Sequence, residues 1–291
     1  MSDSDTFSEL LSSNQLLNEI ILSGQLFALG RLGSVEAQLI DALQQHSKFT
    51  LKQRKLAWIN AGIAYPTNSE LKKFSIEYCR SLAGMDLMAQ WPEPNILNQE
   101  QLIGQYGGSD TRLVPLRILD PIQSFVSGVP QDKIWTQALR DKNVLVISQF
   151  ANTISEQFSK RKDLHQIELL PNFNLQTIVP PSTNGATFLK GNYSRNLKKF
   201  RNQIENEVKS YKLNIALVSA GAYGLPIIAF LKSLGISSIY MGGSLQLLFG
   251  IMGNRWREIE TLQSVVTPRW VMAPKENRPF GWQLIEKGSY W

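Results

Sequence analysis

Polar and glycine residues directly follow four short apolar runs, and these four segments hold most of the residues that could carry chemistry. They are residues 30–36, 148–153, 219–224 and 241–244. Three of them contain glycine where a helix is expected to begin. The unpaired backbone N–H groups of a first helical turn, together with the helix dipole, can hold a phosphate or another anion. The pattern therefore predicts an anion site beyond the carboxyl ends of parallel strands.

Charged candidates in these segments are few. Arg31 and Glu36 flank Ser34 at the first predicted strand end. An arginine and a carboxylate placed there could bind a diphosphate and a divalent cation, or a sugar hydroxyl. The alternative is an Arg–Glu pair on the surface of the first helix. Arg255, beside Trp256, could also reach a phosphate, and an ordinary loop cation is the alternative.

The remaining candidates are uncharged, and all of them lie close to the predicted strand ends except Asn60, a weaker candidate within the helix expected at 52–62. They are Gly33, Asn60, Gln149, Gly221, Ala222, Tyr223, Gly224, Gly242, Gly243 and Gln246. For any single glycine turn, a tight strand–helix connection is the alternative to a ligand site. The 221–224 turn lacks the full G-x-G-x-x-G pattern, and no acidic residue follows about 20 positions later, which disfavours a classical NAD site. Asp86 is a weaker candidate for a base, with a solvated strand-end residue as its alternative.

Short apolar runs alternate with helical patterns along the chain. Strands are expected at 26–29, 85–91, 143–148, 167–170, 175–179, 215–219 and 239–241. Helices are expected at 1–23, 35–43, 52–62, 69–83, 101–106, 132–139, 151–162, 193–211, 225–234 and from 245. This alternation predicts an α/β fold with a Rossmann-like parallel sheet flanked by helices. We expect a single domain over 1–291, with a helical N-terminal segment at 1–23 and a Trp-rich tail at 257–291 that wraps the domain.

Composition excludes several classes of protein. The 291 residues are 43% hydrophobic, which argues against disorder. The lone cysteine, Cys79, excludes an intramolecular disulfide framework and a thiolate zinc cluster. The two histidines argue against a multi-histidine metal site; His46 is expected to be structural and His165 to lie at the surface.

The chain is mildly basic, with a formal net charge of +6. This charge could attract phosphates or an anionic membrane surface, and an ordinary solvated surface is the alternative. No nucleic-acid-binding motif occurs, so no nucleic-acid partner is expected. The polar N-terminus does not match a signal peptide, and no run reaches about 18 apolar residues. We therefore expect a cytoplasmic protein for which peripheral membrane contact is open.

Residues 31–36, 221–224 and 242–256 resemble segments of uncharacterised bacterial proteins found with polysaccharide biosynthesis genes. The resemblance extends through residues 60–62, 65–66, 148–154 and 288–291 and covers most of the chain. A thinner one, carried by Arg-x-Gly-x-x-Glu at 31–36 and by the α/β layout, is to GT-D-fold glycosyltransferases. That family is expected to hold a divalent metal on its donor diphosphate with an Asp-x-Glu motif. The matching positions here are Ser34-Val35-Glu36, so serine replaces the first acid and weakens the expected Mn²⁺ or Mg²⁺ site on Glu36.

The resemblance implies a nucleotide-sugar-dependent glycosyltransferase of bacterial surface polysaccharide biosynthesis, with a saccharide or lipid-linked acceptor. Glu36 is then the expected catalytic residue. Arg31, Arg255 and backbone N–H groups would stabilise the leaving diphosphate. Two alternatives remain open: a Rossmann-like NAD(P)-linked sugar-modifying enzyme, and a non-catalytic assembly partner suggested by the missing acid.

Overall fold

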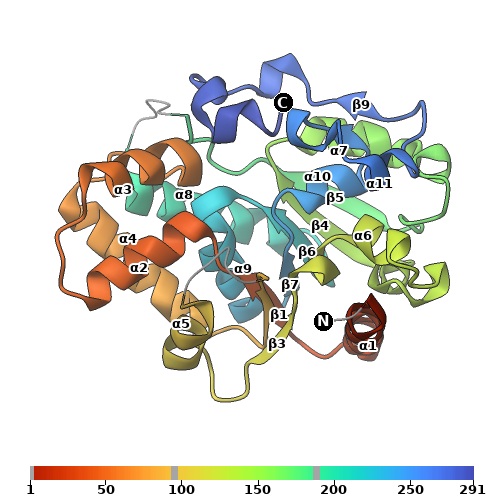
Figure 1. Ribbon diagram of the computed structural model, residues 1–291, viewed down its shortest axis with the longest axis horizontal. Coiled ribbons are helices and arrows are strands. Elements are labelled where there is room, and N and C mark those ends of the chain that lie inside the picture. The colour runs from red at the N-terminus through yellow and green to blue at the C-terminus, as the bar shows by residue number, and fades with distance from the viewer. Residues whose placement is uncertain (1–2, 93–97, 186–190) are drawn as a thin grey trace.

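A seven-stranded sheet forms the centre of the molecule (Figure 1), in a computed structural model that describes residues 3–92, 98–185 and 191–291. The strands are β1 Ala28–Arg31, β2 Leu87–Gln90, β3 Arg112–Pro115, β4 Asn143–Ser148, β5 Asn174–Ile178, β6 Ile215–Ser219 and β7 Ser237–Tyr240. Their order is β3-β2-β1-β7-β6-β4-β5, and every neighbouring pair is parallel. The predicted α/β fold with a parallel sheet is confirmed.

The strand order places a switch point at the middle of the sheet. From β1, the strands β2 and β3 are added toward one edge of the sheet. The later strands form the other half, in which β6 and then β7 are added toward the centre, so that β7 pairs with β1. In that pair Leu29 lies opposite Ile239. Connections leave β1 and β7 in opposite directions, and this is where open α/β sheets leave a crevice at their carboxyl ends.

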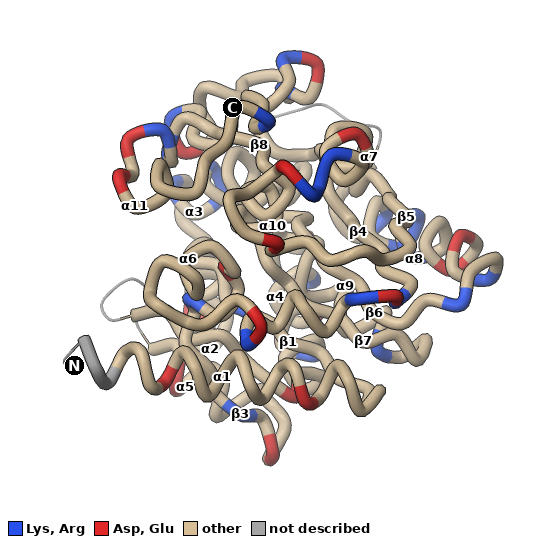
Figure 2. Tube along the Cα trace, turned by 90° about the vertical axis from the view of Figure 1, so that its right-hand side faces the viewer, with Lys and Arg blue, Asp and Glu red and all other residues tan. Residues whose placement is uncertain are grey.

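Helices cover both faces of the sheet because alternate strand residues point to opposite sides. Leu145 and Ile147 face one core, and Val144 and Val146 face the other. On the first face lie α2 Ser34–Gln44, α4 Asn68–Leu82, α5 Gln99–Tyr106, α8 Tyr193–Lys209 and α9 Gly224–Ser233. On the second lie α1 Asp3–Ser23, α6 Pro121–Val126, α7 Ala151–Ser159 and α10 Ser244–Leu248. Figure 2 views the molecule from the side on which α1, α6 and α7 lie.

The C-terminal tail closes over the second face of the sheet. It contains α11 Glu260–Gln263 and β9 Val271–Met272, which pairs in parallel with β8 Ile251–Met252. Trp291 is fully buried in the same core, 6.5 Å from the Phe150 ring centroid. The tail is therefore part of the core rather than a loose appendage.

Some of the predicted elements differ from those in the structure. The helix expected at 132–139 is instead two short 3₁₀-helices, Gln131–Lys133 and Trp135–Leu139, separated by Ile134. The strand expected at 167–170 is wrong: the segment buries Leu169 and Leu170 without pairing to the sheet. The edge strand β3 was not predicted. The helix expected at 52–62 is divided into α3 Leu51–Leu56, which begins with a Thr50–Gln53 capping box, and a π-helical turn, Ala57–Ala61. No helix of the described residues is long and apolar enough to cross a membrane.

Candidate functional site

Two adjacent cavities open at the carboxyl ends of β1 and β7. The larger, about 340 Å³, is called the charged compartment; its charged lining residues are Arg31, Glu36, Arg117, Asp120, Arg255 and Glu286. The smaller, about 110 Å³, is called the neutral compartment because amides and hydroxyls dominate its polar lining: Asn60, Gln149, Ser182, Thr183, Ser219, Tyr223 and Gln246. Arg31, Asn60 and Tyr240 line both.

Arg31 separates the compartments at the last residue of β1. Its guanidinium carbon lies 5.5 Å from the Trp91 ring centroid and 5.2 Å from that of Tyr240, so the cation is held between two aromatic rings. The Tyr240 hydroxyl donates to the Gly221 carbonyl at 2.9 Å, which fixes that ring. The Arg31 Nε is buried and has no hydrogen-bond partner in the structure. An oriented cation with a free donor is suited to an anionic ligand.

Glu36 lies in the first turn of α2 and is only 6% exposed. Within the described residues its carboxylate forms no ion pair and accepts no hydrogen bond from another side chain; its own backbone N–H is its polar contact. Burial raises the pKa of Glu36, although that N–H and the charge of Arg31 act in the opposite direction.

Glu70 occupies the equivalent third position of α4 and provides a comparison. It is also buried, at 3% exposed, but it accepts hydrogen bonds from Ser194 N at 2.7 Å, Ser194 Oγ at 2.6 Å and Asn192 Nδ2 at 2.9 Å. Two buried glutamates at the same helical position thus differ in one respect. Glu70 has partners inside the fold, and Glu36 faces a cavity without them. A buried carboxylate without a partner is costly to maintain, which is typical of a functional residue.

Three of the predicted glycines make room for these side chains. A side chain at Gly33 would overlap the Glu36 carboxylate, and one at Gly242 would overlap the Arg31 guanidinium. Gly242 also has a φ of +63°, a conformation that L-residues rarely adopt. Gly224 lies against the Tyr240 ring, where a Cβ would overlap the ring carbons. The chain's own packing therefore accounts for these glycines, whether or not a ligand also contacts them.

Most of the remaining predicted residues line the compartments. Asn60, Gln149, Gly221, Tyr223, Gly243 and Gln246 line one or both, and Ser34 lines the charged compartment. Ala222 and Gly224 do not; Ala222 is fully buried.

The neutral compartment is formed where the π-helical turn meets the loop that follows β5. Asn60 lies in that turn, and π-helical segments occur frequently at functional sites. Thr183 donates to the Gly62 carbonyl and lies 3.0 Å from the Tyr223 hydroxyl. Burial raises the pKa of Tyr223 to about 12, so this wall stays uncharged at neutral pH.

Arg255 lies at the rim of the charged compartment and is exposed. Its guanidinium forms an ion pair with Glu286 at 3.1 Å and lies over the rings of Trp256 and Tyr290, at 5.4 and 5.5 Å. A contact between Arg255 and a phosphate would have to compete with that ion pair, and it stays a prediction.

Sequence reasoning missed Trp91, Arg117 and Asp120, which all line the charged compartment. Asp120 is the N-cap of α6, and Pro121 is the first residue of that helix. Asp-Pro before an apolar segment is a recognisable helix start, so the sequence contained a signal for this position. It held no signal that the helix start faces the Arg31 side of the sheet.

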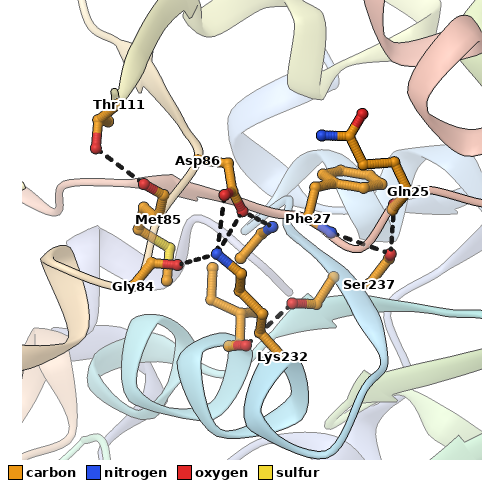
Figure 3. A network of polar contacts seen from close by, with 11 residues as sticks. Gln25, Phe27, Gly84, Met85, Asp86, Thr111, Lys232 and Ser237 are labelled. Carbon is orange, nitrogen blue, oxygen red and sulfur yellow. Dashed lines mark hydrogen bonds and ion pairs between the residues drawn. The ribbon is translucent and has the colours of Figure 1, made fainter. Parts of the chain in front are cut away.

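Asp86 lies outside the site. Figure 3 shows it among the residues that join the amino ends of the strands. It accepts a hydrogen bond from the Ala28 N–H at 2.8 Å and forms an ion pair with Lys232 at 2.7 Å. The geometry thus excludes Asp86 from either compartment, and its prediction as a base is wrong.

Neither histidine reaches the compartments. His165 is 4% exposed, its Nε2 lies 2.8 Å from the Leu248 carbonyl, and its ring meets Trp270 edge-on. Its prediction as a surface residue is wrong, because the tail covers it. Burial lowers the pKa of His165 to about 4, so it is neutral at physiological pH. His46 is exposed in a turn, with Nδ1 2.8 Å from the Gln44 carbonyl.

A divalent cation would find few protein ligands. The described residues contain no group of three or more His, Cys, Asp or Glu side chains suited to a metal. Glu36 and the exposed Ser34 hydroxyl could hold a cation together with the oxygens of a bound diphosphate. This fits Mg²⁺-like cations, which are often held by one or two carboxylates plus substrate phosphates.

Comparisons with known proteins find similarity to this chain among solved structures. No family model and no curated protein matches it. Similar solved structures include a glycosyltransferase (DUF1792) from Streptococcus sanguinis, with 10% identity over 95% of each chain and a TM-score of 0.48. A DUF1792 domain of unknown function has 12% identity over 84% of this chain and 83% of that one, with a TM-score of 0.49. A third structure, described as DUF1792 with a distinct glycosyltransferase fold, has 14% identity over 83% and 82% and a TM-score of 0.44. At these values the likenesses assign no activity to this chain.

Proposed function

We propose that this chain is a nucleotide-sugar-dependent glycosyltransferase. One observation carries the proposal: an arginine held between two aromatic rings and a buried glutamate without a side-chain partner line the same cavity at the switch point of a parallel sheet. Nucleotide ligands of open α/β folds bind at such a point. The resemblance of residues 31–36 to GT-D enzymes supports the same assignment.

The two compartments suit the two chemical parts of such a donor. Arg31 and the free N–H groups at the start of α2 would bind the diphosphate in the charged compartment. Amides and hydroxyls of the neutral compartment would bind uncharged hydroxyl groups of the nucleoside or sugar. Mn²⁺ or Mg²⁺, when bound by Glu36, Ser34 and the diphosphate, would neutralise charge on the leaving group.

Transfer needs stabilisation of the negative charge that develops on the departing diphosphate. Arg31 is held in place before reaction by Trp91 and Tyr240, so little reorganisation is required as that charge develops. Glu36, held over Gly33, would orient a cation or a sugar hydroxyl.

A thermal-shift panel of UDP, GDP, their sugar conjugates and NAD(P), each with and without Mn²⁺, tests the proposal. A ligand that binds only the folded protein stabilises it by about 2.7 kcal/mol at a hundredfold excess over Kd. We expect a nucleoside diphosphate to raise the Tm, and E36Q and R31M to abolish most of that rise.

Two matched variants control for general damage. E70Q removes the buried glutamate at the same position of α4, and R278M removes an arginine stacked 4.3 Å from the Trp282 ring, away from both compartments. Both are expected to lower the Tm and keep the nucleotide shift. A shift with NAD(P) alone would instead favour an oxidoreductase. No shift with any ligand would contradict the donor site and favour an assembly partner.

We further propose that the acceptor, a saccharide or a lipid-linked saccharide, is reached from the cytoplasm at an anionic membrane surface. Helices α3, α4 and α8 contain eleven basic and four acidic residues, a net charge of +7, which exceeds the +6 of the whole chain. Arg54 of α3 donates to Asn68 of α4, and α8 packs against α4, so the three helices adjoin one another. A role in surface polysaccharide assembly belongs to this same proposal.

A further inference from the structure

Asp120 occupies a fixed position on the wall of the charged compartment. Its Oδ1 accepts hydrogen bonds from the backbone N–H groups of Ile122 at 3.0 Å and Gln123 at 3.2 Å. The preceding carbonyl, that of Leu119, accepts a hydrogen bond from Ser244 Oγ at 2.6 Å, which ties this turn to the segment after β7. Pro121 restricts the backbone further. The carboxylate is thus held without help from a ligand.

The second carboxylate oxygen, Oδ2, is not used by the fold. The helix cap engages Oδ1, and within the described part of the chain Asp120 belongs to no ion pair. Capping a helix needs one oxygen only, so the other is available to a ligand in the compartment.

Other charged groups surround Asp120 without neutralising it. Arg31 and Glu36 share the compartment from β1 and α2, and Arg117 shares it from the preceding turn. Arg255 reaches it from the turn after β8, and Tyr240 from β7. Glu286 and Tyr290 reach it from the tail. Of the helices packed on α6, α10 carries no charged side chain, α1 carries the exposed Glu9 and Glu19, and α11 carries the exposed Glu260. Burial raises the pKa of Asp120 to about 6, against the effect of its two N–H bonds. A carboxylate with such a pKa is ionised at neutral pH and still basic enough to take a proton.

We propose that Asp120 is the general base that accepts the proton of the acceptor hydroxyl during sugar transfer, an inference that rests on the proposed function. The acceptor oxygen forms a bond to the anomeric carbon as the bond from that carbon to the phosphate oxygen breaks. The electron pair of the broken bond leaves with the nucleoside diphosphate, and the hydroxyl proton moves to Asp120 Oδ2. A single displacement of this kind inverts the anomeric configuration.

The test uses the D120N variant, because asparagine caps a helix about as well as aspartate but cannot act as a base. Nucleoside diphosphate release is measured with UDP-glucose, UDP-galactose, UDP-N-acetylglucosamine and GDP-mannose and a set of saccharide acceptors. We expect kcat of D120N to fall by about 10²- to 10⁴-fold. The Tm should be unchanged, and the Kd for UDP or GDP should stay within about threefold of the wild-type value. The decline of wild-type kcat below about pH 6 should be absent from the residual activity.

D110N, a substitution of an exposed loop carboxylate, is the matched control and should leave every readout unchanged. If D120N keeps the wild-type kcat and its decline below about pH 6, the inference is overturned. The glycosyltransferase proposal would remain intact. A loss of nucleotide affinity equal to the loss of kcat, or a product of retained configuration, would also overturn the inference. Absence of turnover by the wild type with every donor would instead count against the proposed function.

Discussion

Gly242 has a backbone conformation that favours glycine and also leaves the space that the Arg31 side chain occupies. Its φ is +63°, and its Cα lies against the Arg31 guanidinium. We expect G242A to lose about 1–2 kcal/mol from the backbone conformation alone. It should also displace Arg31 from between its two rings, so nucleotide affinity should fall at least about tenfold. Chemical denaturation and titration with UDP or GDP measure the two effects.

Gly235 supplies the control for that prediction. Its φ is +80°, yet no atom lies within 4 Å of where a Cβ would be. G235A therefore carries the backbone cost without the collision, and nucleotide affinity should stay at the wild-type value. Equal affinity losses in the two variants would show that the space at Gly242 does not position Arg31.

Single residues also show what sequence reasoning could and could not reach. Arg31 and Glu36 could be found from the sequence because they lie within a few residues of the end of a predicted strand, and the carboxyl ends of parallel strands meet at one edge. Asp120 follows no predicted strand, since β3 is a short edge strand with two exposed residues and a terminal proline. His165 was misplaced because the segment that buries it begins a hundred residues later, at Val266 and Trp270. Local pattern carries no information on such contacts.

Burial of His165, in the segment before β5, makes the free energy of unfolding depend on pH. Its pKa is lowered to about 4 in the fold, whereas an unfolded histidine titrates near 6.5. Between these values the unfolded chain binds a proton that the folded chain does not, so the free energy of unfolding falls as the pH drops from about 6.5 to 4. The loss is on the order of 3 kcal/mol.

Urea denaturation across that pH range checks this expectation. H165Q keeps an N–H donor for the Leu248 carbonyl but has no titration, so that part of the pH dependence should vanish. H46Q, at an exposed turn, should retain it. An H165Q protein with the wild-type pH dependence would exclude His165 as its source.

The amino ends of β1 and β2 and the end of α9 are joined by Asp86 and Lys232 (Figure 3). D86A should lose about 1–2 kcal/mol, because a backbone N–H loses its acceptor and a half-exposed ion pair disappears. The nucleotide-induced Tm shift should be unchanged, since the compartments lie at the other edge of the sheet. D132A, which breaks the exposed pair with Lys133, should change stability by less than about 0.5 kcal/mol. Loss of the nucleotide-induced Tm shift in D86A would show that contacts at the amino ends of the strands affect ligand binding at their carboxyl ends.

Helices and strands could be predicted from the sequence where the residue pattern of the element alone identifies it. The apolar, β-branched runs of β4 and β6 are buried on both sides, and that pattern identifies them without neighbours. Residues 167–170 contain three apolar residues, but the Glu168 carbonyl accepts a hydrogen bond from the Gln137 side chain at 2.5 Å rather than from a strand. The π-helical turn at 57–61 differs from an α-helix by its hydrogen bonds alone, which periodicity does not reveal.

Charge is divided unequally over the whole molecule. The net +7 of α3, α4 and α8 contrasts with α1, which contains no lysine or arginine. We expect binding to phosphatidylglycerol vesicles but not to phosphatidylcholine vesicles, with the affinity falling as NaCl rises. Reversing two exposed lysines in K198E/K199E should weaken binding at least about tenfold.

K160E/K162E changes the net charge by the same amount beyond α7 and should have little effect. Vesicle sedimentation at two salt concentrations separates these cases. Equal weakening by both double variants would mean that total charge, and not this set of helices, governs the interaction.

The position of β7 beside β1 also has a consequence for how the protein is made. β1 ends at residue 31 and β7 begins at residue 237, so the centre of the sheet closes only after the more than 200 residues between these strands have been synthesised. At about 5–20 residues per second, the first strands leave the ribosome on the order of ten seconds or more before their central neighbour exists. During that interval the inner edge of β1 has no neighbouring strand, so we expect the nascent chain to be most prone to pairing with other chains at this stage.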